Sequence, residues 1–163
     1  MAEIRHAVME DIPGLLLIYN EIIANSTAVY QDEPLSLDNR QAWFAARQQA
    51  GFPVLVAMDA GRVVGFSSFG EYRAFHGYRF TVEHSVHIAP DYRGRGLGGA
   101  LLAGLLPLAT SLGKHAMLGV IDADNAASIA LHAKHGFVQV AHMPQVGFKF
   151  GRWLDAVFMQ RLL

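Results

Sequence analysis

Arginines and glycines alternate in one short stretch of the chain, Arg93-Gly94-Arg95-Gly96-Leu97-Gly98-Gly99. The stretch follows a segment, 81–90, that predicts an extended strand, and it precedes an uncharged segment, 98–113, that predicts a helix. Backbone N–H groups at the start of a helix are free to donate, and the helix dipole adds partial positive charge there. Glycines keep side chains out of the way, while Arg93 and Arg95 add full charges. The stretch therefore predicts a site for a polyphosphate.

Two known patterns fit this stretch. Gly94, Gly96 and Gly99 match Gly-x-Gly-x-x-Gly, the dinucleotide-binding fingerprint. Arg93, Gly96 and Gly98 match Arg/Gln-x-x-Gly-x-Gly/Ala, which resembles the pyrophosphate signature of the GNAT superfamily of acetyl-CoA-dependent acetyltransferases. A tight glycine turn without a ligand is the third interpretation, so the surrounding chain has to decide.

A carboxylate stands in the middle of the strand before the glycine turn. Burying Glu83 among apolar residues costs free energy unless the carboxylate is paired or used in catalysis. We therefore predict that Glu83 is a general base, with a salt bridge to a nearby arginine as the alternative. Alternation along a strand places its residues on two faces, with Glu83, Ser85 and His87 on one and Val82, His84, Val86 and Ile88 on the other.

The chain has eight histidines and no cysteine. The absence of cysteine excludes disulfides, cysteine metal sites and an acyl-cysteine intermediate. His132 and His135 stand three residues apart in a predicted helix and could meet, whereas His84 and His87 face opposite sides of a strand. No carboxylate completes a metal-ligand set around them, so we expect no metal.

Composition limits the class of protein. With 163 residues, 52% of them hydrophobic and 17% charged, the sequence predicts one folded domain, 1–163. A net charge of −1 disfavours attraction to nucleic acid or anionic membranes. The uncharged run between Arg95 and Lys114 is interrupted by glycines and Pro107, which favours a buried helix over a membrane span. Because residues 1–6 lack a signal-peptide layout, we expect a cytoplasmic protein.

The order of predicted elements indicates an α/β protein, with a mixed sheet and helices on both faces. A hairpin turn is expected at 59–62, and a loop rich in aromatic residues at 70–79. Strands are expected at 4–8, 53–58, 63–69, 81–88, 115–121, 137–141 and 153–161, and helices at 11–25, 36–51, 98–113 and 125–135.

A dinucleotide-binding fold explains this order less well. That fold opens with its glycine turn and then needs several βα units, for which the chain after Gly99 is too short. The consecutive strands before Gly99 are also antiparallel in character. One detail favours it, because Asp122 ends the next strand about 20 residues on, where a ribose-binding acid would stand.

Further motifs resemble one family of GNAT enzymes. An asparagine-initiated helix that ends in Gly-Phe resembles the second GNAT cofactor motif, here Asn125-x-x-Ser128 with Leu131, His132, Gly136 and Phe137. Three other groups resemble the phosphinothricin and methionine sulfoximine N-acetyltransferases: Glu83-His84-Ser85, Leu131-His132 and Lys149-x-Gly151-x-Trp153-x-Asp155. The resemblance extends over nearly the whole chain.

The resemblance implies the GNAT fold, whose central twisted sheet splays open at the cofactor site, with acetyl-CoA as co-substrate. It places the pantetheine arm against the backbone of one strand, where a free N–H donates to the thioester oxygen. Asn125 matches a position that contacts the cofactor, although a plain helix cap explains it equally well. The implied cofactor-binding residues are Val86, His87, Ile88, Arg93, Gly94, Arg95, Gly96, Leu97, Gly98, Gly99 and Asn125.

The resemblance also implies an acceptor and its contacts. Arg73 would hold an α-carboxylate, although an exposed arginine is the simpler interpretation. His132 stands where many GNAT enzymes carry a tyrosine that acts as the general acid, so it is either a general acid or a core residue. Glu83 would act directly or through water. The implied substrate-binding residues are Arg73, Ala74, Phe75, Glu83, His84 and Ser85.

The function predicted in this way is N-acetylation of a small amino acid such as methionine sulfoximine, methionine sulfone or phosphinothricin by a homodimer. The alternatives are acetylation of a polyamine, an aminoglycoside or a protein N-terminus, and a non-catalytic acyl-CoA-binding domain.

Overall fold

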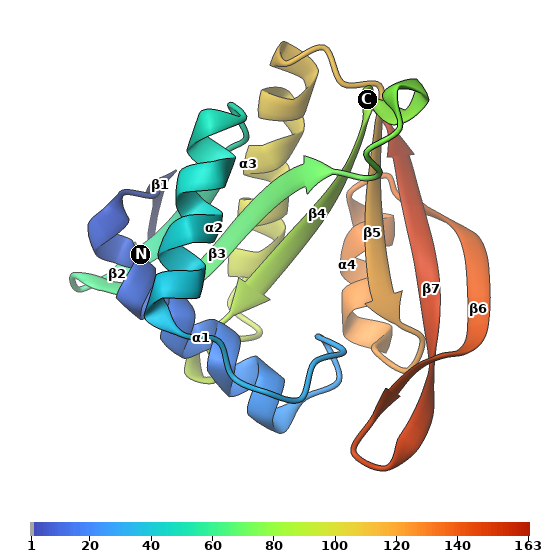
Figure 1. Cartoon of the computed structure of the whole chain (residues 1–163), viewed down its shortest axis with the longest axis horizontal. Coiled ribbons are helices and arrows are strands. Elements are labelled where there is room, and N and C mark those ends of the chain that lie inside the picture. Colours follow the sequence, from blue (N-terminus) through green and yellow to red (C-terminus); the bar gives the residue numbers. More distant parts are fainter. Residues whose placement is uncertain (1) are drawn as a thin grey trace.

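Residues 2–163, which the computed structural model describes, form a seven-stranded sheet and four α-helices (Figure 1). The strand order is β1-β2-β3-β4-β5-β7-β6. Only β4 and β5 are parallel, and every other neighbouring pair is antiparallel within the described chain. The strands are β1 (Glu3–His6), β2 (Val54–Asp59), β3 (Arg62–Glu71), β4 (Thr81–Ile88), β5 (Ala116–Asp122), β6 (Val138–Lys149) and β7 (Arg152–Leu162).

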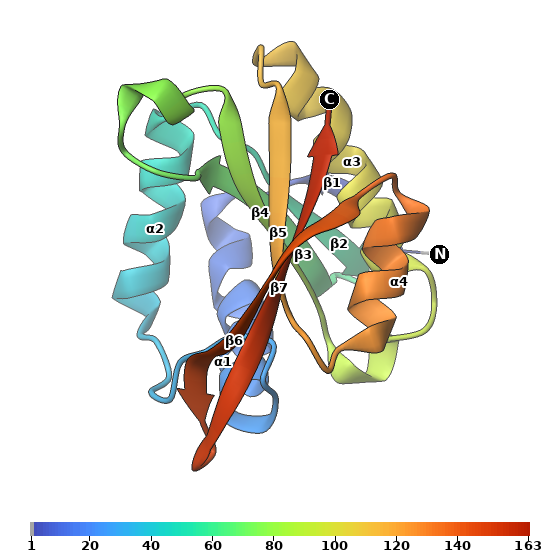
Figure 2. The ribbon, with the colours of Figure 1, turned by 90° about the vertical axis from the view of Figure 1, so that its right-hand side faces the viewer.

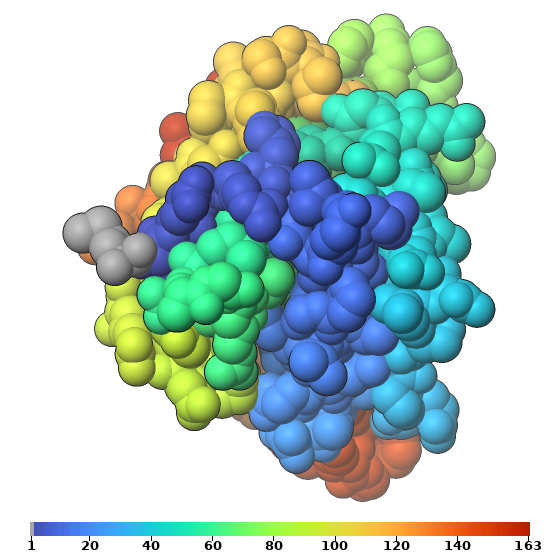
Figure 3. Space-filling view, turned by 90° about the vertical axis from the view of Figure 1, so that its left-hand side faces the viewer, coloured from blue at the N-terminus to red at the C-terminus, as the bar shows by residue number. Residues whose placement is uncertain are grey.

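Two helices cover each face of the sheet (Figure 2). On one face, α1 (Ile12–Asn25) and α2 (Leu37–Gln49) bury Leu15 and Phe44 against Val56 and Phe66 of the sheet. The outer surface of this layer is formed by α1 and α2, beside the β2–β3 hairpin (Figure 3). On the other face, α3 (Leu97–Ser111) and α4 (Ala126–Lys134) cover a second apolar core, formed mainly by Val64, Phe69, Val82, Leu101, Leu102, Leu105, Met117 and Phe137.

The sheet opens between β4 and β5. Their parallel pairing begins at Thr81–Ala116 and ends at Glu83–Leu118, whereas β4 stays paired with β3 as far as Ile88. Beyond Glu83 the two strands diverge, as Figure 1 shows. The β3–β4 ladder carries no register shift in the described residues, so the opening occurs without a bulge on β4. The expected splayed sheet is therefore confirmed, and residues 85–88 keep one strand edge unpaired.

Most predicted elements are confirmed, several with their expected signals. Strand β4 has the predicted bounds, and Ser36 caps α2 by accepting from the Asn39 N–H. The β2–β3 turn holds Ala60 and Gly61 at φ 47° and 76°, as a tight hairpin requires. Pro107 lies inside α3, which continues to Ser111.

The prediction for the last hairpin was wrong in length. A strand was expected at 137–141, but β6 runs from Val138 to Lys149. Most of its residues are exposed, and its register against β7 shifts twice, at Gln139/Ala141 and Met143/Gly147. These irregularities break the alternation of apolar and polar residues by which a strand is detected in a sequence.

A buried lysine ties this hairpin to the end of α1. The ammonium group of Lys149, which is 1% exposed, donates to the carbonyl oxygens of Ile23, Ser26 and Val29 at 2.6, 2.7 and 2.8 Å. A lysine thus satisfies carbonyls at the C-terminus of a helix. The same contacts hold the chain that leaves α1, from Ser26 to Val29, beside the open end of the sheet.

Lys149→Met should lower the free energy of unfolding by about 2–4 kcal/mol, because it leaves buried carbonyls without donors. Urea unfolding of the variant and the wild type measures the difference. Lys134→Met, which changes an exposed lysine of α4, is the control and should shift stability by less than about 0.5 kcal/mol. Equal effects of the two changes would contradict the role given to Lys149.

Candidate active site

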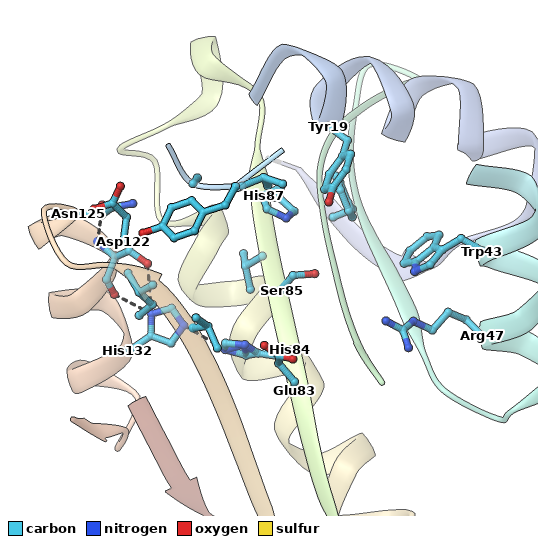
Figure 4. A pocket seen from close by; sticks show the side chains of 18 of the residues that line it. Tyr19, Trp43, Arg47, Glu83, His84, Ser85, His87, Asp122, Asn125 and His132 are labelled. Atoms are coloured by element: carbon cyan, nitrogen blue, oxygen red, sulfur yellow. Dashed lines mark hydrogen bonds between the residues drawn. The ribbon is translucent and has the colours of Figure 1, made fainter. Parts of the chain in front are cut away.

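A cavity of about 480 Å³ occupies the opening between β4 and β5 (Figure 4). One wall comes from α2 and the chain after α1, and the other from β5 and the start of α4. The side chains that line it include Tyr19, Tyr30, Arg40, Trp43, Arg47, Glu83, His84, Ser85, His87, Asp122, Asn125 and His132. The structure therefore brings the predicted residues 83–87, Asn125 and His132 together.

Glu83 lies where the two strands separate. It is half-buried and has no hydrogen bond and no ion pair within 4.0 Å among residues 2–163, so the predicted alternative of a salt bridge is not seen. Burial raises the pKa of the Glu83 carboxyl, and the positive charge of Arg47 partly offsets this rise. An unpaired carboxylate with a raised pKa is suited to accept a proton.

His84 and His132 form a buried pair, with their Nε2 atoms 3.0 Å apart. His132 Nδ1 donates to the Ser128 carbonyl oxygen at 2.7 Å, so its Nε2 accepts from His84 Nε2–H. Gly119 makes the pair possible, because a Cβ there would lie 2.7 Å from His84 Cε1. His132 of α4 therefore meets His84 of β4, not His135 of its own helix.

Burial favours the neutral form of both imidazoles in this pair at neutral pH. Burial, followed by the proximity of His132, lowers the pKa of His84 to about 3, and burial also lowers the pKa of His132. In this state the Nδ1–H of His132 donates to the backbone of its own helix, and the Nε2 lone pair accepts from His84. The role of His132 as a general acid stays a prediction, and it requires an additional proton on the pair.

The glycine turn divides into two parts. Gly94 and Gly96 have φ values of 73° and 81°, and a Cβ on either would meet no atom within 4 Å, so open space faces them. Gly98 and Gly99 instead let α4 approach α3, since a Cβ there would lie 3.3 Å from Leu131 Cδ1 and 3.1 Å from His135 Cε1. The first part leaves open space for a ligand, and the second part brings the free N–H groups at the start of α3 close to α4.

The charges beside the turn are already engaged. Arg93 lies 3.6 Å from the Glu21 carboxylate, and the Arg95 guanidinium lies 4.7 Å from the centre of the Tyr92 ring. Both arginines stay at the helix start, where they add positive charge for an anion.

Asn125 and Asp122 bound the far wall. The Asn125 side chain accepts from the Ser128 N–H at 3.1 Å, so its role as a helix cap is seen, and the residue also lines the cavity. Asp122 accepts from the Asp124 N–H, while its other carboxylate oxygen is buried without a partner in the described chain. A carboxylate at this place was considered only for ribose binding, so its position in the cavity wall was missed.

The predicted acceptor loop lies apart from the cavity. Arg73, Ala74 and Phe75 are exposed and do not line it, and the Arg73 guanidinium lies 5.3 Å from the centre of the Tyr72 ring. Their assignment to the substrate stays a prediction. Sequence reasoning overlooked Arg40 and Arg47, which stand seven residues apart on the inner side of α2 and flank Trp43.

In residues 2–163 no three His, Cys, Asp or Glu side chains are grouped closely enough to hold a metal ion. No helix of this part of the chain is long and apolar enough to span a bilayer.

Comparison with known proteins decides between the two readings of the glycine turn. A model of the acetyltransferase (GNAT) family matches residues 15–137. The chain belongs to the GNAT family. The dinucleotide fold is thereby excluded, and the single parallel strand pair explains why, because that fold needs several.

Individual GNAT proteins are similar over almost the whole chain. The L-methionine sulfoximine/L-methionine sulfone acetyltransferase of Pseudomonas paraeruginosa is 52% identical, covering 98% of this chain and 93% of its own. The phosphinothricin N-acetyltransferase of Alcaligenes faecalis is 40% identical over 94% of this chain and 79% of its own. The structure of yncA from Salmonella typhimurium with its cofactor acetyl-CoA has a TM-score of 0.98 at 48% identity, covering 100% and 94% of the two chains.

Gly96→Val should weaken acetyl-CoA binding, because its side chain would enter the open space above the turn. Valine at a positive φ is also strained by about 1–2 kcal/mol, so a control with the same strain is needed. Gly61→Val provides it, since Gly61 has φ 76° and open surroundings in the β2–β3 turn. Calorimetric titration should show weaker binding only for Gly96→Val, and equal affinities would remove the turn from the cofactor site.

Proposed function

We propose that this GNAT enzyme transfers the acetyl group of acetyl-CoA directly to the α-amino group of a small amino acid. The candidate acceptors are methionine sulfoximine, methionine sulfone and phosphinothricin, in line with the names of its relatives. The observation that carries the proposal is Glu83, an unpaired carboxylate at the point where the sheet opens onto the cavity.

The residues present fit acetyl-CoA. Val86, His87 and Ile88 lie on the edge of β4 that β5 leaves unpaired, and Gly94 and Gly96 face open space. When bound, acetyl-CoA supplies an activated thioester carbonyl. A backbone N–H of the free edge would hydrogen-bond the thioester oxygen, and the turn from Arg93 to Gly99 would hold the pyrophosphate. Asn125 would approach from the opposite wall.

Glu83 has the central role in the proposed reaction. At neutral pH an amino acid carries an ammonium group, which is not a nucleophile until it loses a proton. Glu83 would accept that proton, directly or through water, and the free amine would then form a bond to the acetyl carbon as the carbon–sulfur bond breaks and the coenzyme A thiolate leaves. The neighbouring His84 and Ser85 would contact the acceptor, and His132 would act as acid if the histidine pair gains a proton.

We further propose a cytoplasmic homodimer in which residues 1–163 act as one domain, without nucleic acid or membrane partners. The dimer is supported by an apolar surface on the β6–β7 hairpin, where several large side chains are exposed: Met143 40%, Val146 49%, Phe148 53%, Phe150 57% and Trp153 62%. An apolar patch of this kind marks an interaction surface. Sedimentation velocity of the full chain measures the oligomeric state.

Glu83→Gln keeps the shape of the side chain and removes the base. Turnover at neutral pH should fall by about 10²–10⁴-fold, and rising pH should restore part of it as more free amine becomes available. In the wild type, activity should fall as pH drops through the raised pKa of Glu83, and the variant should lack this acidic limb. Steady-state kinetics from pH 5 to 9 measures both effects.

The control for this change is Glu71→Gln, which neutralises an exposed carboxylate at the edge of the same cavity. It should keep most of the turnover. Wild-type turnover in Glu83→Gln near neutral pH would exclude Glu83 as the base.

The wild-type enzyme should prefer methionine sulfone to three other amines: methionine, the carboxamide of methionine sulfone, and a polyamine. A free α-carboxylate offers charge-assisted hydrogen bonds that the carboxamide lacks, and the loss should reduce kcat/KM by about ten- to a hundredfold. Thiol release from acetyl-CoA across these amines measures the order. A polyamine or carboxamide that reacts as well as the free acid would exclude an amino-acid acetyltransferase while leaving the family assignment intact.

A further inference from the structure

An arginine of α2 reaches into the cavity without an anionic partner (Figure 4). The side chain of Arg47 is half-buried, and its Nε is enclosed by protein atoms with no hydrogen-bond acceptor. No hydrogen bond or ion pair of its guanidinium is formed with any of residues 2–163. Arg5, by contrast, binds Asp11 through two hydrogen bonds of 2.7 and 2.9 Å. A guanidinium withdrawn from water without an anion is costly, so Arg47 is prepared for a partner that the chain does not supply.

The sheet is shaped to receive this guanidinium. A Cβ at Gly70 of β3 would overlap Nη1 of Arg47, so the arginine lies directly over the glycine backbone. On the other side, the ring of Trp43 lies 5.5 Å from the Arg47 Cζ. Gly70 pairs with Glu83 in the β3–β4 register. The cation is thus held beside the proposed base without touching its carboxylate.

The chemistry of an amino acid matches this arrangement. Its amino and carboxylate groups are attached to the same carbon, so a site that deprotonates the amine must bind the carboxylate close to the base. Arginine presents a planar pair of N–H donors that fits a carboxylate. We propose that Arg47 binds the α-carboxylate of the acceptor, and that Gly70 keeps the space for its guanidinium. This inference rests on the proposed function, because it requires an amino acid as acceptor.

Arg40 strengthens the positive character of this wall. Its guanidinium stacks 5.0 Å from the ring centre of Tyr19 and 4.8 Å from that of Trp43, and it contacts no carboxylate among the described residues. The wall that would bind the carboxylate of the acceptor is therefore α2, which carries both arginines and the ring of Trp43 between them. Arg73, the arginine expected from the family resemblance, lies outside the cavity.

Variants of Arg47, Gly70, Arg62 and Arg73 test the proposal through one ratio, kcat/KM for methionine sulfone divided by kcat/KM for its carboxamide. Arg47→Gln should reduce this ratio about ten- to a hundredfold by impairing the acid alone, and Arg47→Lys should reduce it less. Gly70→Ala should also lower it, because the new methyl group displaces the guanidinium while the arginine remains. Arg62→Gln removes an exposed arginine of the β2–β3 turn and should leave the ratio unchanged.

Gly70→Ala separates the position of the guanidinium from the presence of the arginine. The atom it displaces is the end of a flexible side chain, so the variant should fold, as urea unfolding checks, and its KM for acetyl-CoA should stay near that of the wild type. A ratio that stays at the wild-type value in the Arg47 and Gly70 variants would overturn the inference. So would a ratio lowered by Arg73→Lys but not by the Arg47 variants. If the wild type itself fails to prefer the free acid, the proposed acceptor class falls together with this inference.

Discussion

The parallel pairing of β4 with β5 ends at Glu83, and the rest of the site depends on this ending. A strand that continues without its neighbour keeps backbone donors and acceptors that need partners from elsewhere. Beyond Glu83 the two strands carry separate walls, with α1 and α2 on one side and α4 on the other. The opening therefore creates the cavity, exposes a strand edge for a ligand, and places the carboxylate where both meet.

Two cations of the chain, Lys149 and Arg47, have opposite surroundings. Lys149 is fully buried, and three carbonyl oxygens satisfy its ammonium group, so it holds the chain after α1 in place. Arg47 is only half-buried, yet its guanidinium has no acceptor in residues 2–163. A cation whose donors are all satisfied stabilises the fold, whereas an unsatisfied one at a cavity surface is available to a ligand. The number of acceptors around each cation, not its degree of burial, distinguishes the two roles.

Local signals in the sequence were sufficient for much of the fold. The apolar pattern of β4, the cap at Ser36 and the glycines of the β2–β3 turn each act within a few residues, so they could be read directly. The length of β6 could not, because its exposed residues and shifted register follow from pairing with β7. The contact of Arg47 with Gly70 was equally hidden, since it joins a helix to a strand that follows later in the chain. Motifs predicted residues 83–87, Asn125 and His132 of the cavity, and only the fold revealed Arg40 and Arg47 on α2.

The buried histidine pair agrees with the proposed reaction, in which removal of a proton from the acceptor is the assisted step. His132 directs its one proton to the Ser128 carbonyl and uses its lone pair on His84, and burial keeps both rings neutral. Such a pair has nothing to donate to a departing thiolate at neutral pH. A thiol, with a pKa near about 8.5, needs little help to leave as an anion, whereas an ammonium group with a pKa of about 8–10 must lose its proton before it can attack. Glu83, the proposed base, would therefore serve the step for which assistance is needed, and the neutral histidine pair lines the cavity beside it.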